Sequence, residues 1–129
     1  MAIHLVRRLR RSDEALGISS SRLSALSVLV FGGPCTLGEL AAAEQVTAPS
    51  MSRTVAALED GGLVARRSDP HDGRAVRLEA TLRGRRLMHR GRALREQRLV
   101  RELAGRDERD LRALERATAI LRELESSEG

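Results

Sequence analysis

Residues 36–62 read TLGELAAAEQVTAPSMSRTVAALEDGG, and this stretch decides the fold. The runs 37–43 and 48–60 are rich in alanine and leucine, which favour helices. Thr36 and Glu39 have the spacing of a capping box, which marks the start of the first run. Two glycines end the second run, and only a short turn separates the first run from the second. The stretch therefore predicts a helix-turn-helix.

The segment that follows has the pattern of a β-hairpin. Residues 63–67 alternate loosely between apolar and polar side chains, and residues 75–80 alternate with Val76, Leu78 and Ala80 inward. The residues between them, 68–73, are almost all turn formers. A hairpin directly after a helix-turn-helix is a wing, so we assign the wing to residues 63–80.

Four further segments have helical patterns, and they flank the stretch quoted above: 2–15, 20–31, 82–104 and 108–125. The last has a heptad seam, formed by Leu111, Leu114, Ala117, Leu121 and Leu124. These helices carry more apolar surface than a small lobe needs. Pairing with a second copy of the chain would cover it, and packing within one chain is the alternative.

The sequence thus predicts one domain over 1–129, mainly α with a small β-hairpin wing. A winged helix lobe spans 20–81, and helical dimerisation regions span 1–18 and 82–129. The low aromatic content, with Phe31 as the single aromatic residue, agrees with a helical core.

The charge of the chain is carried by arginine, and its placement indicates a polyanionic partner. The formal net charge is +5 and there is no lysine. Residues 61–101 hold twelve arginines against four acidic residues. A net charge of this size by itself is also typical of an ordinary solvated surface.

Several function classes lack support in the sequence. Cys35 is the single cysteine, and the three histidines share no metal-ligand spacing, so we expect no disulfide, no metal and no cofactor. Cys35 fits a structural role better than a redox sensor. No nucleophile–base set indicates an enzyme. No membrane span or signal peptide is recognisable, so we expect a cytoplasmic protein.

The helix expected over 48–60 offers a face for DNA. Met51, Val55 and Leu58 should face the core, and another face carries Ser50, Arg53, Thr54 and Ala57. Arg53 and Thr54 suit base contacts in the major groove. The hydroxyls and amides of Ser50 and Ser52 suit phosphate contacts near the helix start, although either serine could simply cap the helix.

The wing offers a second set of DNA contacts. Arg74 lies at its tip, where an arginine can probe the negative potential of a narrow minor groove. Asp72 could brace the loop through backbone amides or by pairing with Arg74. His71 and Arg77, like Arg66 and Arg67, suit phosphate contacts. The plain alternative is an exposed turn with a surface ion pair of little energetic value.

The order of elements and the wing sequence together resemble the MarR family of bacterial transcriptional regulators. The most specific part is DPHDGRAVRLEATLRG, residues 69–84, in which Asp72, Arg74, Thr81 and Gly84 match the family pattern. The resemblance implies the roles given above for Asp72 and Arg74. It also implies a small anionic or phenolic effector, which the arginine-rich stretch 83–92 could help to hold.

The leading hypothesis is a homodimeric regulator that reads a pseudo-palindrome, because two half-sites about 34 Å apart match a two-fold dimer. Residues 48–60 are its recognition helix, double-stranded DNA is its partner, and repression is the expected mode. Two alternatives stay open. One is a helical protein-interaction module, and the other is an architectural DNA binder without sequence choice.

Overall fold

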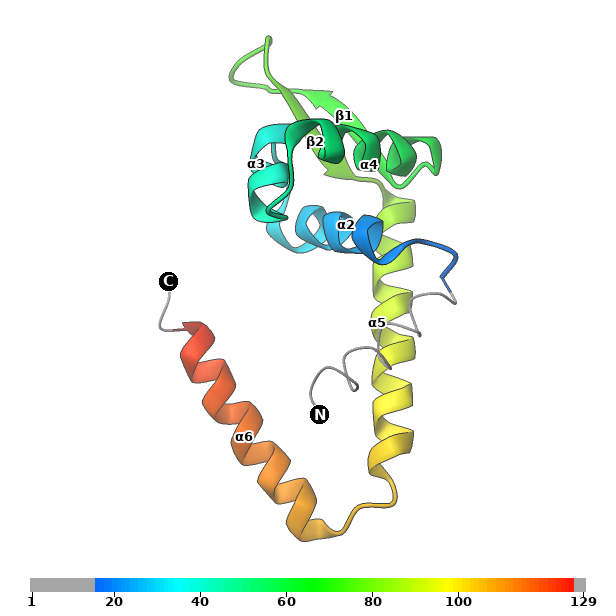
Figure 1. The fold of residues 1–129 in the computed structure, drawn as a ribbon, viewed down its shortest axis with the longest axis vertical. Coiled ribbons are helices and arrows are strands. Elements are labelled where there is room, and N and C mark those ends of the chain that lie inside the picture. The colour runs from blue at the N-terminus through cyan, green and yellow to red at the C-terminus, as the bar shows by residue number, and fades with distance from the viewer. Residues whose placement is uncertain (1–15, 127–129) are drawn as a thin grey trace. The chain divides into compact units, whose positions relative to one another are not determined.

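The computed structural model describes residues 16–126, so the helix expected over 2–15 lies outside the described residues. The chain divides into two compact units, Met1–Arg95 and Glu96–Gly129, and each is described by itself. The elements in chain order are α2 (Ser20–Gly32), α3 (Leu37–Ala43), α4 (Ala48–Asp60), β1 (Val64–Ser68), β2 (Val76–Ala80), α5 (Leu82–Leu103) and α6 (Glu108–Ser126) (Figure 1). This order confirms the predicted winged helix-turn-helix.

The helix-turn-helix begins as its residue types dictate. The Glu39 amide donates to the Thr36 hydroxyl at 3.2 Å, and the Thr36 amide donates to the Glu39 carboxylate at 2.8 Å. These two bonds form the predicted capping box. In the turn between α3 and α4, Gln45 has a φ of 55°, a left-handed conformation that is uncommon for a residue other than glycine.

The core of the first unit lies where α2 crosses α4 and β2. Its largest fully buried side chains are Leu26, Leu40, Leu58, Leu78, Met88 and Val55. All are aliphatic or thioether side chains, in keeping with the low aromatic content. Leu26 of α2, Leu58 of α4 and Leu78 of β2 lie in one core, so the hairpin is anchored to the same core as α4.

The hairpin is antiparallel, and its inner end is more deeply buried than its outer end. Val64 pairs with Ala80 and Ser68 pairs with Val76. Cys35, ahead of α3, adds a bridge to Leu78 through hydrogen bonds of 3.1 and 2.8 Å. The expectation that Val76 points inward is wrong, because its side chain is 47% exposed. It lies at the outer end of the strand, beyond the bridge to Cys35.

A tight joint connects the hairpin to α5. The Thr81 hydroxyl donates to the Gly62 carbonyl at 2.7 Å and accepts from the Gly84 amide at 3.1 Å. The Thr81 amide donates to the Leu63 carbonyl at 3.0 Å. A Cβ atom on Gly84 would lie 2.2 Å from that same carbonyl oxygen. The Thr-x-x-Gly part of the motif therefore serves this close contact.

The spacing of Leu87, Leu94, Val100 and Leu103 predicts an apolar side for α5, and the structure buries a different face. Its buried residues are Gly84, Met88 and Gly91, spaced along one face. Leu94 is 38% exposed. The glycines are buried because the backbone of α5 approaches its neighbours closely there, and hydropathy alone gives no sign of such a contact.

The second unit contains the end of α5 and all of α6. The carboxylate of Asp107 accepts the Asp110 amide at 2.8 Å and caps α6. The apolar side chains of α6 are exposed in the single chain, among them Leu111, Leu114, Ile120, Leu121 and Leu124. Among the described residues, no helix is both long and apolar enough to cross a membrane.

Candidate nucleic-acid interface

Helix α4 has one face fixed inward and the opposite face open. Its first turn is capped by Thr47, whose hydroxyl accepts the Ser50 amide at 3.3 Å. Neither Ser50 nor Ser52 is the capping residue. Met51, Val55 and Leu58 are buried, as the sequence predicts. Their burial fixes the rotation of the helix about its axis and turns other residues outward, namely Pro49, Arg53 and Ala56.

The four residues that the sequence selects on α4 are not equally available. Arg53 is exposed, and no ion pair holds it within the described part of the chain. Ser50 and Ser52 are half-buried. Thr54 is also half-buried, and its hydroxyl donates to the Ser50 carbonyl at 3.3 Å. Their contacts with DNA stay predictions, of which the one for Arg53 agrees best with the geometry.

The tip of the wing is a compact loop over residues 69–75, which extends away from the helices (Figure 1). The Asp69 amide donates to the Ala75 carbonyl at 2.9 Å, and the Ala75 amide donates to the Asp72 carbonyl at 3.0 Å. The Asp72 carboxylate accepts the Arg74 amide at 3.1 Å. Of the two ways in which Asp72 could brace the loop, the structure shows the one through a backbone amide.

The side chains of His71 and Arg74 are exposed on this loop. Within residues 16–126, no ion pair engages the guanidinium of Arg74. The other arginines of the hairpin are paired. Arg66 contacts Glu59 at 2.9 Å, and Arg67 contacts Glu79 at 2.7 Å.

Arg77 is paired as well, and its partner is a residue that the sequence did not single out. Its Nε atom lies 2.8 Å from Oδ2 of Asp69. The hydrogen bond from the His71 amide, followed by that from Arg77, lowers the pKa of Asp69 below its ordinary value. The same contact raises the pKa of Arg77. Asp69 stands before a proline in a turn, and that position favours an Asx turn of this kind.

Comparison with known proteins agrees with this geometry. A family model described as MarR family matches residues 16–75. An HTH-type transcriptional regulator of Mycobacterium tuberculosis is 40% identical over 111 residues, which cover 84% of this chain and 78% of that protein. The chain belongs to the MarR family. A second relative, from Mycobacterium leprae, is 38% identical over 124 residues and covers 95% of this chain and 85% of its own.

Solved structures of other proteins have the same fold as this chain. A MarR family protein from Bacillus stearothermophilus superposes with a TM-score of 0.81 at 26% identity, covering 97% of this chain and 87% of its own. The YusO protein from Bacillus subtilis superposes with a TM-score of 0.79 at 23% identity, covering 95% and 89%. The second likeness is one of fold alone.

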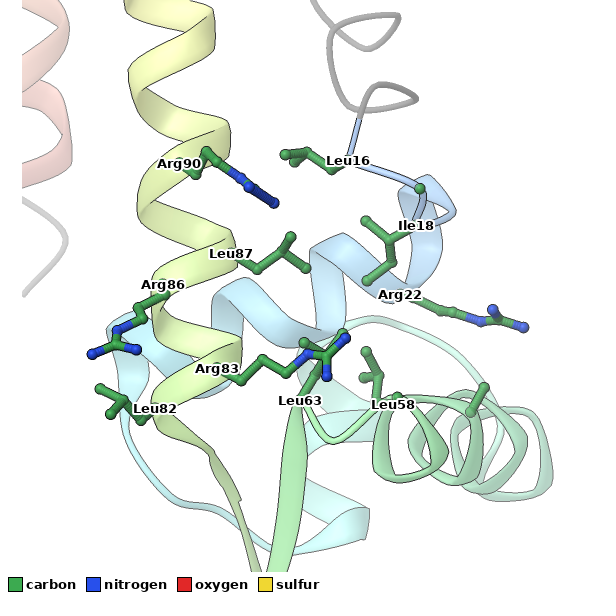
Figure 2. A pocket seen from close by; sticks show the side chains of 13 residues that line it. Leu16, Ile18, Arg22, Leu58, Leu63, Leu82, Arg83, Arg86, Leu87 and Arg90 are labelled. Atoms are coloured by element: carbon green, nitrogen blue, oxygen red, sulfur yellow. The ribbon is translucent and has the colours of Figure 1, made fainter.

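A cavity of about 820 Å³ opens beside α4 of this MarR protein. One wall comes from α4 and the residues after it, including Ala57 and Gly61, and another from the first turns of α5. Figure 2 shows Arg90 extending from α5 toward Leu16, above Leu87. Four arginines and no acidic residue are among the lining side chains; the arginines are Arg22, Arg83, Arg86 and Arg90.

Cys35 has a structural place in the lobe. Its backbone forms the bridge to Leu78 described above. Burial, followed by the negative charge of Glu39, raises the pKa of the Cys35 thiol, and Arg77 offsets part of this effect. A raised pKa lowers the thiolate fraction, which is the opposite of what an oxidant sensor needs.

Proposed function

We propose that this MarR protein is a homodimeric, sequence-specific DNA-binding repressor. In each subunit α4 enters a major groove, and the loop 69–75 reaches the flanking minor groove. Two such subunits read a pseudo-palindrome with half-sites about 34 Å apart. Members of the family are transcriptional regulators, and the DNA contacts and the sign of regulation are the proposal.

One observation carries this proposal. The cations with no ion pair among the described residues include one on the open face of α4 and one at the wing tip, Arg53 and Arg74. Arg66, Arg67 and Arg77 are each neutralised by a carboxylate. An exposed arginine without a partner can bind a base edge or a phosphate without first breaking an ion pair.

Exposed apolar side chains support the dimer. Leu114 is 44% exposed and Leu121 is 59% exposed on α6. Both belong to the heptad seam, and a seam of this kind is normally buried against a second helix. A second copy of the chain presents the same seam and would bury it.

The cavity beside α4 supports an effector with an apolar body and a negative charge. Leucine and isoleucine side chains would contact the body, and Arg83 and Arg90 are placed to contact the charge. Benzoate is the first probe, measured by calorimetry with the full chain. Binding that is lost in Arg90→Gln, with folding unchanged, supports the site. Equal binding by both proteins contradicts it.

Selection from a random duplex pool, followed by titration at two salt concentrations, tests DNA recognition. A regulator enriches one palindrome and binds it more tightly than a scrambled duplex at both concentrations. An architectural binder shows a salt-dependent affinity that is equal for all sequences. A protein-interaction module shows no affinity for any duplex. Either of the last two outcomes refutes the proposal.

Replacement of Arg74 tests the wing contact. One arginine contact contributes about 1–3 kcal/mol, and the dimer has two, so Arg74→Ala should weaken specific binding at least about 30-fold. Arg22→Ala is a matched control that removes the same charge from α2, and it should change the affinity less than about 3-fold. Equal effects of the two variants would exclude a specific role for the wing tip.

A further inference from the structure

A set of hydrogen bonds holds the loop end of the hairpin to the rest of the lobe. The Nε atom of Arg77 donates to Oδ2 of Asp69 at 2.8 Å. Its Nη1 atom donates to the carbonyl oxygen of Pro34 at 3.2 Å. Pro34 lies in the connection between α2 and α3, 43 residues earlier in the chain. Arg77 therefore links the loop of the hairpin to the helical part of the lobe.

The bonds continue from Asp69 to the tip of the wing. The second carboxylate oxygen of Asp69 accepts the amides of His71 and Asp72 at 2.8 and 3.4 Å. The Asp72 carboxylate in turn accepts the amide of Arg74. The Asp69 side chain is only 12% exposed, so water competes poorly for its oxygens. A continuous path of hydrogen bonds thus runs from Arg77 to the backbone of Arg74.

We propose that Arg77 is a positioning residue, which fixes the wing loop through Asp69 and Pro34 so that Arg74 is presented to the minor groove. This inference rests on the proposed function, and it replaces the expected phosphate contact of Arg77. The planar guanidinium suits the task, because it donates in two directions at once from one rigid group. A lysine ammonium at the same position would keep the charge without that fixed geometry.

The two roles for Arg77 predict opposite results for Asp69→Asn. In the positioning role, asparagine keeps only one acceptor oxygen, so it loses the link either to Arg77 or to the loop amides, and specific binding weakens about 10-fold or more. In a phosphate-binding role, the same substitution frees Arg77 and removes a negative charge, so binding tightens or stays unchanged. Arg77→Lys also distinguishes the two roles, because lysine keeps the charge needed for a phosphate contact and does not hold the loop in position.

A double-mutant cycle with Arg74 tests whether Arg77 acts through it. If it does, Arg77→Ala weakens binding about 10-fold in the wild type and less than about 2-fold in the Arg74→Ala background. Two independent DNA contacts would instead multiply their effects in the double variant. Multiplied effects, or tighter binding by Asp69→Asn, overturn the proposal.

Glu79→Gln is the matched control for Asp69→Asn. Glu79 also pairs with a hairpin arginine, Arg67, and it accepts no amide of the loop. Its substitution should leave specific affinity within about 2-fold of the wild type or raise it. If the wild type binds no duplex specifically, the proposed function fails. Amide exchange at His71 and Asp72 still tests the tether then, because it should quicken in Arg77→Ala and stay unchanged in Glu79→Gln.

Discussion

Substitution of Gly84 by alanine tests the joint between the hairpin and α5. The added Cβ would lie 2.2 Å from the carbonyl oxygen of Leu63 and 3.1 Å from Cδ1 of Leu26. A real Cβ atom essentially never lies within 3.0 Å of another heavy atom, so α5 and the Leu63 backbone must separate by about 0.8 Å. The carbonyl cannot yield freely, because it also accepts the Thr81 amide at 3.0 Å.

The expected loss follows from three effects. Overpacking against rigid backbone costs about 3 kcal/mol, at the upper end of its usual range. Weakening the bond between Thr81 and Leu63 costs about 1 kcal/mol. Alanine is a better helix former than glycine, and this difference offsets about 1 kcal/mol of the loss. We therefore expect Gly84→Ala to lower the free energy of unfolding by about 3 kcal/mol.

Urea unfolding at fixed protein concentration, followed by circular dichroism at 222 nm, measures this loss, since the chain has no tryptophan or tyrosine. Two glycines serve as controls. Gly38→Ala meets no atom within 4 Å. Gly91→Ala meets only the end of the Leu16 side chain within 3.0 Å, and that end can move. Both should stay within about 1 kcal/mol of the wild type. A Gly84→Ala protein as stable as these controls would refute the argument.

Three further predictions concern α4, the seam and the thiol. Arg53→Ala should weaken specific binding about 10- to 100-fold in duplex titrations. Thr54→Val should change it less than about 3-fold, because that hydroxyl is bonded within the helix. Equal losses of affinity in the two variants would contradict the assignment of Arg53 to the DNA-binding face of α4. Leu121→Asp should raise the dissociation constant of the dimer at least about 100-fold, measured by sedimentation, and Arg116→Asp should leave it unchanged. A dissociation constant unchanged in both variants would exclude the heptad seam as the dimer interface. Because burial raises its pKa, the Cys35 thiol should be alkylated by iodoacetamide more slowly than free cysteine at pH 8, and its rate should level off at a higher pH than that of free cysteine. A rate that levels off at the same pH or a lower one would contradict this.

The sequence was enough to predict the elements of the lobe, because local signals and the tertiary fold agree there. Thr36 and Glu39 form the expected capping box, and Met51, Val55 and Leu58 have the helical spacing of a buried face. The same agreement extends to the order of the helices and the hairpin, and it is typical of sequences in which each level supports the others.

The parts that sequence reasoning missed depend on contacts between distant residues. Nothing in the spacing of the arginines distinguishes Arg74, which is unpaired among the described residues, from Arg77, whose partners are Asp69 and a carbonyl far back in the chain. The buried glycines of α5 escaped notice for a similar reason, since their burial results from a close backbone approach. Its spacing places Thr54 on the open face of α4, whereas in the structure it is half-buried and its hydroxyl is bonded to the Ser50 carbonyl.

One consequence follows from the place of the cavity relative to the joint at Gly84. The cavity is lined both by α4, at Ala57 and Leu58, and by the first turns of α5, at Arg83 and Leu87. The joint fixes α5 to the residues between α4 and β1, so a ligand that moved α5 would also act on the base of the wing. Regulation requires that the two states bind DNA with different free energies. Because α4 and the wing share one core with this joint, we expect a shift there to move both proposed DNA contacts together.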